Sequence, residues 1–211
     1  MAADIIEQKN IILFVTIVLI LALCLAFWKP GKRTKYRFIR LSIGNLLIHL
    51  MDGFVTYINT PDLAYEWNPL IRVWGFGWGA LFTANFLGFV LILLATWYFD
   101  RYAYPHIPAD NVFDYYMKLF YGENYKPVWF WYKFSKNWRA QCAMIGYALY
   151  WGLTIGAVIP VIGWFWYMLD IDIAWWHSAY LSAGTGVGIA LFEAYVWTKK
   201  GYLKSNESGR I

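Results

Sequence analysis

The chain contains 211 residues with a formal net charge of +5; 60% of its residues are hydrophobic and only 15% are charged. Soluble domains carry about 45–50% apolar and about 25% charged residues, so this composition excludes a disordered chain and an ordinary soluble enzyme. The two cysteines, Cys24 and Cys142, both lie in apolar runs, which excludes a disulfide framework and a paired-cysteine metal or redox site. The sequence therefore predicts a polytopic membrane protein.

Five stretches are long and apolar enough to cross a bilayer as helices, which requires about 20 mostly apolar residues. They cover about 11–28, 41–60, 73–99, 140–169 and 174–198. The longest segment between them, about 100–139, is rich in aromatic residues. No repeat or linker divides the chain, so we expect a single transmembrane domain over residues 1–211, folded as an all-α bundle of five transmembrane helices.

The first span resembles a signal peptide in its position and apolar character. However, Asp4 and Glu7 precede it where a signal peptide carries basic residues, and no small-residue cleavage site follows it. We therefore interpret this span as a retained signal anchor.

Basic residues gather in the segments that follow the first, third and fifth spans. Sixteen of the 18 lysines and arginines lie there, and the two exceptions are Lys9 and Arg72. Because positive residues are retained in the cytoplasm, this distribution predicts an N-terminus outside and a cytoplasmic C-terminus. We expect a bacterial cytoplasmic (inner) membrane, with an organellar inner membrane as the alternative, although no arginine-rich transit segment precedes the first span.

The second span carries a row of polar residues that are spaced four, three, four and three positions apart: Asn45, His49, Asp52, Thr56 and Asn59. This spacing confines them to an arc of about 80° on one helix face. Since a charge at mid-bilayer costs about 2.5–3.5 kcal/mol even on lenient scales, we expect the row to face the bundle interior or a water-filled cavity. His49 and Asp52 are close enough along the helix to share one ligand.

The fifth span carries a second, weaker polar row, formed by Ser178, Ser182, Thr185 and Glu193. Glu193 lies near the cytoplasmic end, close to Lys199, where an acid can reach the membrane interface. Asn85 of the third span could contact either row. The sequence leaves open whether the two rows face each other.

Small residues recur every four positions in three of the spans: Ala80, Ala84 and Gly88, then Gly152 and Gly156, then Gly184 and Gly188. Such spacing lets membrane helices approach closely, so we expect these faces to pack. Pro160 in the fourth span predicts a kink.

The segment from about 100 to 139 is too aromatic for a free loop. Asp110 or Asn111 could cap a short helix with Val112, Phe113, Tyr116, Met117 and Phe120 on one face, and Gly122 could end it. The basic and aromatic run after Pro127 favours a position on the inner membrane surface, because tryptophan and tyrosine prefer the headgroup layer. The alternative is a docking surface for a partner protein.

One stretch combines the motif Asp52…Thr56-Tyr57…Thr60-Pro61-Asp62-Leu63 with Glu66-Trp67-Asn68-Pro69. It resembles an uncharacterised family of small bacterial polytopic membrane proteins that has an intramembrane Asp, a following Thr and a Glu-x-Asn-Pro turn before the next span. The resemblance covers about 20 residues and implies no reaction. It implies that Asp52, Thr56, Glu66 and Asn68 belong to one local feature.

The polar residues permit several kinds of site. A metal site could use His49 and Asp52, with Glu66 or His177 as further ligands. An Asp–His pair inside the membrane also suits ion or proton coupling. An acid/base enzyme could use the same pair with a serine of the fifth span as nucleophile. The remaining interpretation is a hydrogen-bonded strut that holds the bundle together.

The leading hypothesis from the sequence is a non-enzymatic integral membrane protein that acts as a subunit or accessory component of a membrane assembly. Its small size, its close-packing glycine faces and its wide cytoplasmic aromatic surface without a catalytic motif favour it. The first alternative is a small transporter or an ion- or proton-coupled protein with a polar core at Asp52 and His49. The second is an intramembrane metal-dependent or acid/base enzyme.

These hypotheses share one set of polar-core candidates: Asn45, His49, Asp52, Thr56, Glu66, Asn68, Asn85, Ser182 and Thr185. No cofactor is implied. The expected partners are the lipid bilayer and either other membrane subunits or further copies of the chain. The positive charge belongs to loops that face anionic lipid, so nucleic acid is not an expected partner.

Overall fold

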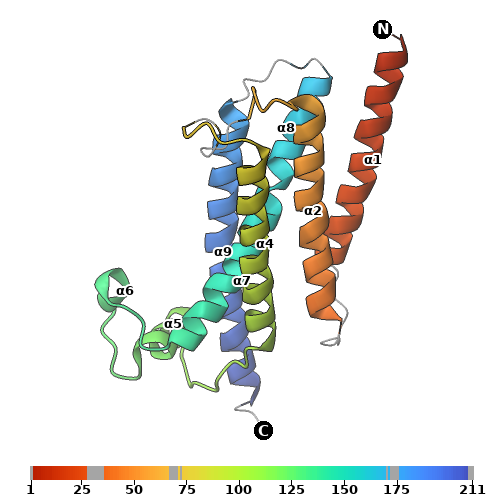
Figure 1. The fold of residues 1–211 in the computed structure, drawn as a ribbon. Helices are drawn as coiled ribbons and strands as arrows, with labels where there is room; N and C mark the ends of the chain where they lie inside the picture. The colour runs from red at the N-terminus through yellow and green to blue at the C-terminus, as the bar shows by residue number, and fades with distance from the viewer. Residues whose placement is uncertain are drawn as a thin grey trace.

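The computed structural model describes residues 2–27, 36–66, 71, 73–169, 171 and 176–208. These residues form helices joined by turns and loops, with no strand among them, as the all-α prediction requires. The helices are α1 (Ala2–Phe27), α2 (Arg37–Asn59), α4 (Trp78–Arg101), α5 (Val112–Tyr121), α6 (Trp129–Tyr132), α7 (Trp138–Gly156), α8 (Val158–Met168) and α9 (Trp176–Ser208). The long helices run side by side, and α5 and α6 lie beside the end of the bundle where α9 terminates (Figure 1).

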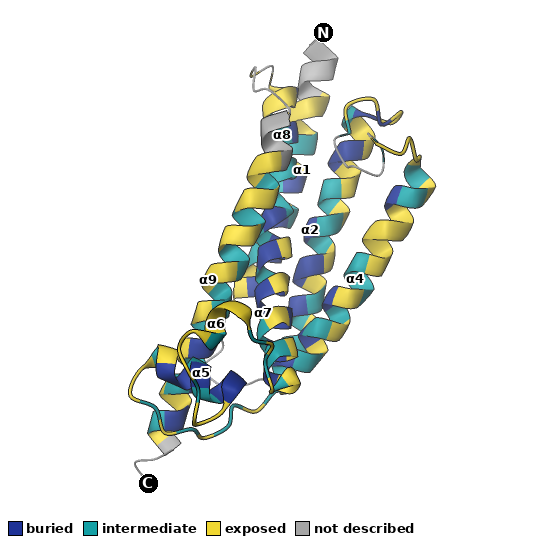
Figure 2. Cartoon of the chain, turned by 90° about the vertical axis from the view of Figure 1, so that its left-hand side faces the viewer, coloured by how far each residue is buried: buried dark blue, intermediate teal, exposed yellow. Residues whose placement is uncertain are grey.

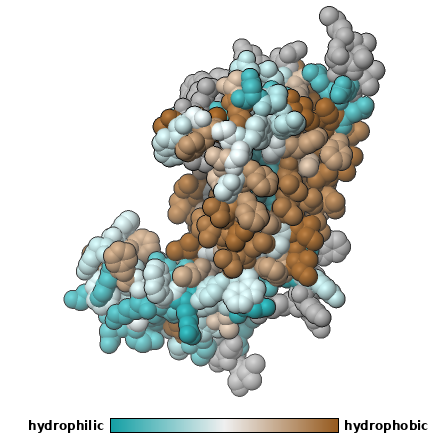
Figure 3. All heavy atoms as spheres, in the orientation of Figure 1, coloured by the Kyte–Doolittle hydropathy of each residue, from teal (hydrophilic) through white to brown (hydrophobic). Residues whose placement is uncertain are grey.

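Within the described part of the chain, four helical segments are long and apolar enough to cross a membrane: Glu7–Phe27, Arg37–Asn59, Trp78–Arg101 and Trp138–Met168. A broad band of hydrophobic residues covers the middle of the visible face of the bundle, and hydrophilic residues gather at both ends (Figure 3). These features indicate a membrane protein. The predicted fifth span lies in α9, which runs beside the others along the bundle (Figure 1) but is not one of these four segments.

α4 begins at Trp78, five residues later than the 73 expected from the sequence. Gly75 has a φ of +66°, in the left-handed region, and Gly77 caps the helix in an extended conformation. Glycine adopts both conformations without strain. The predicted boundary is wrong because the glycines interrupt the helix although the run stays apolar.

α9 continues ten residues beyond the expected end at 198, because the loop that follows α4 packs against it. The Ser205 hydroxyl accepts a hydrogen bond from the Ile107 N–H at 2.8 Å and donates one to the Ile107 carbonyl at 2.7 Å. Trp197 is buried beneath the rings of Tyr102 and Tyr104. These contacts stabilise a helical extension that apolar length alone does not predict.

Glycines set the closest helix contacts, but only in part those that the sequence suggested. A Cβ at Gly152 would lie 2.5 Å from the carbonyl oxygen of Gly186, so α7 and α9 touch through their backbones there. In contrast, a Cβ at Gly88, Gly184 or Gly188 would meet nothing within 4 Å. The expectation that these three glycines pack within the chain is wrong, because they lie on the outer sides of α4 and α9.

α7 and α8 form one segment that is interrupted at Ala157. Pro160, in the first turn of α8, has no N–H to donate to the Gly156 carbonyl. The hydroxyl of Ser182 in α9 donates to that carbonyl instead, over 2.7 Å. The helix is interrupted in the turn that precedes Pro160, the residue at which the sequence predicts a kink.

The short helix α5 confirms the caps that the sequence predicts. The Asn111 side chain accepts a hydrogen bond from the Asp114 N–H, and Gly122 ends the helix with a φ of +91°. The predicted buried face is partly wrong: Phe113 is exposed, and the buried set is Asp114, Tyr115, Met117, Leu119, Phe120 and Tyr121. α5 packs against α7 and α9 together, and these two neighbours bury more than one side of it.

Candidate functional site

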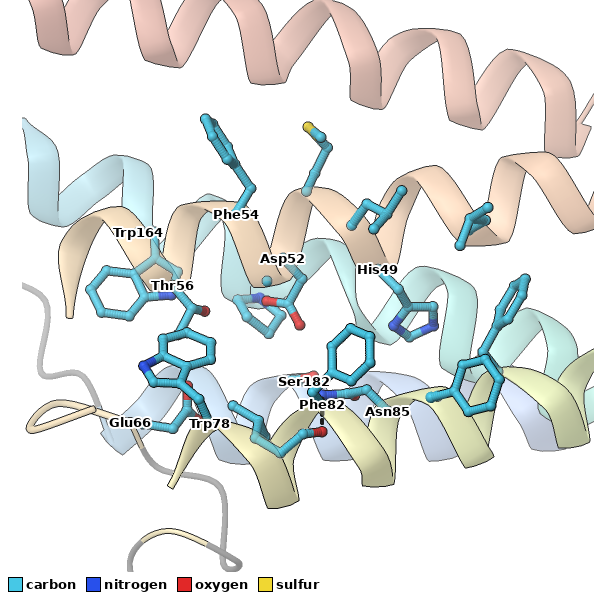
Figure 4. A pocket seen from close by; sticks show the side chains of 18 of the residues that line it. His49, Asp52, Phe54, Thr56, Glu66, Trp78, Phe82, Asn85, Trp164 and Ser182 are labelled. Atoms are coloured by element: carbon cyan, nitrogen blue, oxygen red, sulfur yellow. Dashed lines mark hydrogen bonds between the residues drawn. The ribbon is translucent and has the colours of Figure 1, made fainter. Parts of the chain in front are cut away.

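A cavity of about 900 Å³ lies between α2, α4, α8 and α9, in the half of the bundle where α2 ends (Figure 4). Its walls are mostly aliphatic and aromatic. Besides Tyr65, six polar or ionisable side chains interrupt them, namely His49, Asp52, Thr56, Glu66, Asn85 and Ser182. All six are among the candidates that the sequence predicts. Three helices and the loop after α2 supply them, so the cavity brings three residues of the α2 row together with Ser182 of the α9 row.

The polar row of α2 divides between two roles. Asn45 lies outside the cavity and is fully buried, and its side-chain N–H donates to the Thr154 hydroxyl of α7 at 2.8 Å. Further along the row, Asn59 donates to the Val55 carbonyl of its own helix. The Asn45 bond joins two helices and fits the strut interpretation, whereas the Asn59 bond stays within α2. His49, Asp52 and Thr56, between them, line the cavity.

Asp52 is the acidic group on the helical wall of the cavity. It projects from α2 toward α4, whose Phe82 and Asn85 project back across the space (Figure 4). His49 lies one turn away on the same helix, and its Nε2 is buried without a hydrogen-bond partner. The next residue, Gly53, adds no side chain beside the carboxylate. Asp52 therefore faces an open volume inside the protein rather than a close-packed neighbour.

Glu66 reaches the cavity because the chain turns back after α2. The Thr60 hydroxyl donates to Asp62, and Leu63 adopts a φ of +61°, which is uncommon for a residue other than glycine. The Glu66 N–H then bonds to the Leu63 carbonyl at 3.1 Å. This turn brings Glu66 to the cavity that Asp52 and Thr56 line. Asn68 lies outside the described residues.

Asn85 and Ser182 complete the polar lining from α4 and α9. The Asn85 side-chain N–H donates to the Leu81 carbonyl at 3.0 Å, and the Ser182 hydroxyl donates to Gly156. Each thereby satisfies a backbone group and keeps its oxygen as an acceptor. The two side-chain oxygens can therefore accept a hydrogen bond or contact a cation. The Ser182 hydroxyl proton is not free to be donated to a ligand, because it is already bonded to the Gly156 carbonyl.

The rest of the α9 row does not join this site. Thr185 is half-buried and does not line the cavity. Glu193 lies farther along the helix, where one carboxylate oxygen is buried without a hydrogen-bond partner and the side chain interacts with Tyr147. Lys200 donates to the same Tyr147 hydroxyl. The side chains of His177 and Ser178 lie outside the described part of the structure.

A metal centre would need ligands beyond those that the structure describes. Across the described residues, no group of three or more His, Cys, Asp or Glu side chains is close enough to hold an ion. His49, Asp52 and Glu66 thus share a cavity without forming a ligand set by themselves. The side chain of His177, the fourth candidate ligand, lies outside the described part of the structure.

Several cavity residues escape sequence reasoning. The walls come from Trp78, Phe82 and Phe86 of α4 and from Pro160 and Trp164 of α8. The pattern of apolar residues along a membrane helix does not distinguish the face that lines a cavity from the face that contacts lipid. Thr154, the partner of Asn45, carries a usable signal, since a hydroxyl within an apolar run predicts a hydrogen bond.

Comparisons with protein-family models, with curated proteins and with solved structures find no match to this chain. The interpretation of the site therefore rests on its own geometry.

Proposed function

We propose that this protein is a small ion- or proton-coupled transporter whose polar core is formed by Asp52 and His49. The observation that carries the proposal is the cavity of about 900 Å³ that collects Asp52, His49 and Glu66 between mostly aliphatic and aromatic walls. Intramembrane carboxylates and histidines mark ion pathways and proton relays, because an uncompensated charge there is costly. None of the described residues that line the cavity is a lysine or arginine.

The chemistry of Asp52 favours exchange between a proton and a cation. In a low-dielectric cavity a carboxylate is stabilised either by protonation or by a positive charge close to it. A proton and a cation therefore compete for the same carboxylate oxygens of Asp52. The oxygens of Thr56, Asn85 and Ser182 provide further acceptors along the same walls. Such competition at one site couples the binding of a cation to the release of a proton.

The proposed topology has five spans, with the N-terminus outside and the C-terminus in the cytoplasm of a bacterium. Two observations support it. α1 begins at one end of the bundle and α9 ends at the other, which fits an odd number of crossings (Figure 1). The end where α9 terminates carries basic residues such as Arg37, Arg101 and Lys133. In this orientation the cavity lies in the outer half of the membrane.

The second candidate function is a subunit of a larger membrane assembly. Gly184 and Gly188 lie one turn apart on α9, and nothing within 4 Å would meet a Cβ at either position. Small residues on an uncovered membrane-facing side allow another helix to approach closely. Both functions are compatible, since a transporter can operate as an oligomer. The intramembrane enzyme has less support, because Ser182, the serine of α9 that lines the cavity, already donates its proton to the Gly156 carbonyl.

Proton release tests the coupling directly. The purified full-length protein is placed in a weakly buffered neutral-lipid nanodisc suspension, and the pH is recorded as chloride salts of sodium, potassium, tetramethylammonium and tetraphenylphosphonium are added. We expect at least one of these cations to release up to about one proton per chain. The Asp52→Asn variant should release none.

The control is Glu123→Gln, which removes an exposed carboxylate near the α5–α6 loop, far from the cavity. This variant should release protons like the wild type. If no cation in the series releases more protons from the wild type than from Asp52→Asn, the coupled-transporter proposal is wrong.

A further inference from the structure

We propose that the cavity binds a hydrophobic organic cation, which enters from the acyl-chain layer between α2 and α4 and places its charge against Asp52. This inference rests on the proposed function, because it names the class of solute that competes with the proton. It is carried by the chemistry of the cavity walls, the position of the rim and the single acidic group on α2.

The walls are suited to an organic ion rather than a bare inorganic one. Divalent ions such as Ca²⁺ require six to eight oxygen ligands in proteins. The polar groups of this cavity are few and are separated by aliphatic and aromatic side chains, notably Leu50, Phe54, Phe82, Phe89 and Trp164. A volume of about 900 Å³ lies within the range of pockets that hold drug-sized molecules.

The rim of the cavity lies where acyl chains would be. Leu50, Phe82 and Phe86 line the cavity, and yet 52%, 73% and 56% of these side chains are exposed on the surface of the bundle. They belong to α2 and α4, and both helices carry exposed residues along their length (Figure 2). A ligand that passes between these side chains would leave lipid rather than water. The apolar part of the ligand would be in contact with apolar groups both before entry, among the acyl chains, and after entry, in the cavity.

The interior then selects the charge of the ligand. Asp52 offers a carboxylate, and the faces of Trp78, Trp164 and Phe82 carry the negative potential that attracts organic cations. An anion of the same size and apolar surface would meet the same walls but would be repelled by the carboxylate. Charge, and not hydrophobicity alone, should therefore decide which hydrophobic ion binds.

A series of probes separates charge from apolar surface. Tetraphenylphosphonium is a hydrophobic cation, tetraphenylborate is an anion of similar size and surface, and tetramethylammonium is a cation without the aromatic groups. Equilibrium binding of each radiolabelled probe is measured on the full-length protein in neutral-lipid nanodiscs, after subtraction of partitioning into empty nanodiscs. Competition by dodecyltrimethylammonium, which carries a single alkyl chain, distinguishes a lipid-like source of the cation from a compact free solute.

We expect tetraphenylphosphonium to bind at least about tenfold more tightly than either other probe. Asp52→Asn should weaken its binding about tenfold or more, whereas Asp52→Glu should retain it and Glu123→Gln should leave it unchanged. Phe86→Ala should weaken tetraphenylphosphonium without affecting tetramethylammonium. A circular-dichroism thermal melt of each variant in the same nanodiscs establishes that it is folded.

Two results would overturn the inference and leave the proposed function standing. The first is proton release by sodium, potassium or tetramethylammonium that equals the release by tetraphenylphosphonium. The second is proton release by any cation together with equal binding of tetraphenylborate that Asp52→Asn does not alter. The absence of proton release with every cation would instead remove the proposed function together with its solute class.

Discussion

The hydroxyl of Ser182 donates a hydrogen bond over 2.7 Å to the carbonyl oxygen of Gly156, the group that Pro160 leaves without its helical partner. Pro160 and Ser182 both line the cavity. The interruption between α7 and α8 and the attachment of α9 to it are thus parts of one arrangement. In a membrane such a freed carbonyl must be satisfied by a neighbouring helix, because lipid offers no donor.

Ser182→Ala should lower the stability of the bundle by about 1 kcal/mol, since interhelical hydrogen bonds in membranes contribute about 0.6–2 kcal/mol. The loss should nearly vanish in a Pro160→Ala background, where the new N–H at position 160 can bond to Gly156. Unfolding of the four proteins in a denaturing-detergent titration forms a double-mutant cycle. Equal losses from Ser182→Ala in both backgrounds would show that the two residues act independently.

Asp52 and Asn45 should respond differently to substitution, although they lie on one helix face. Asn45→Ala removes a fully buried hydrogen bond to Thr154, and we expect it to destabilise the protein by about 1 kcal/mol or more. Asp52→Asn keeps the shape of the side chain and removes an ionisable group, so the protein should accumulate and unfold like the wild type. The measurement is thermal unfolding of both variants beside the proton-release assay. A protein that fails to fold with Asn at position 52 would assign Asp52 to the strut.

Asp114 should make the α5 region sensitive to acid. Burial raises the pKa of its carboxyl, but hydrogen bonds from the Asp110 N–H and the Tyr125 hydroxyl, together with the Lys118 ion pair at 3.0 Å, outweigh burial and hold this pKa below its ordinary value of 3.8. A lowered folded-state pKa contributes stability above 3.8, and this contribution is lost as the pH falls through the folded-state pKa.

We therefore expect Asp114→Asn to weaken amide protection in α5 at neutral pH, and we expect this difference from the wild type to shrink as the pH falls below 3.8. Hydrogen–deuterium exchange of Val112–Tyr121, corrected for the intrinsic pH dependence of exchange, measures this effect. Glu123→Gln serves as the control, because that side chain is 69% exposed and lies 3.8 Å from Lys118. A difference between wild type and Asp114→Asn that does not shrink as the pH falls below 3.8 would contradict the assignment.

The sequence predicted the polar row that lines the cavity and allowed a cavity beside it, but it did not predict the walls. His49, Asp52 and Thr56 share one face of α2 because of their spacing alone, however the neighbouring helices pack. The walls formed by Phe82 and Trp164 depend on how three helices meet, which apolar patterns do not record. The same reason explains Gly184, whose spacing suited close packing although the contact in the structure passes through Gly186.

The loop around α6 should lie in the headgroup layer of the inner membrane surface. Trp131 and Phe134 are 80% and 90% exposed, and yet hydrogen bonds fix the loop, including one from the Tyr121 hydroxyl to the Lys133 carbonyl at 3.1 Å. The run from 126 to 139 carries four basic residues and no acid, so anionic headgroups would complement it. The loop therefore presents exposed aromatic side chains on a backbone that hydrogen bonds already fix within the protein.

A fluorophore on a cysteine at position 134, in a chain whose Cys24 and Cys142 are replaced by serine, would report on this position. We expect brominated lipids to quench it several-fold more than the same label at position 123. Substitution of Phe134 should leave the fold intact, because this side chain is almost fully exposed. Quenching as weak at 134 as at 123 would instead favour the partner-protein interpretation of the loop.

The uncovered glycines of α9 test the assembly proposal. Gly188→Leu enlarges a position with nothing within 4 Å, whereas Gly152→Leu drives a side chain into the Gly186 carbonyl. We expect Gly152→Leu to prevent folding, because backbone cannot yield as a side chain does. Gly188→Leu should fold but reduce the cross-linked oligomer in mild detergent. Val187→Leu, at an adjacent exposed position, should leave that oligomer unchanged, and a wild-type chain that is always monomeric would exclude self-assembly through this side of α9.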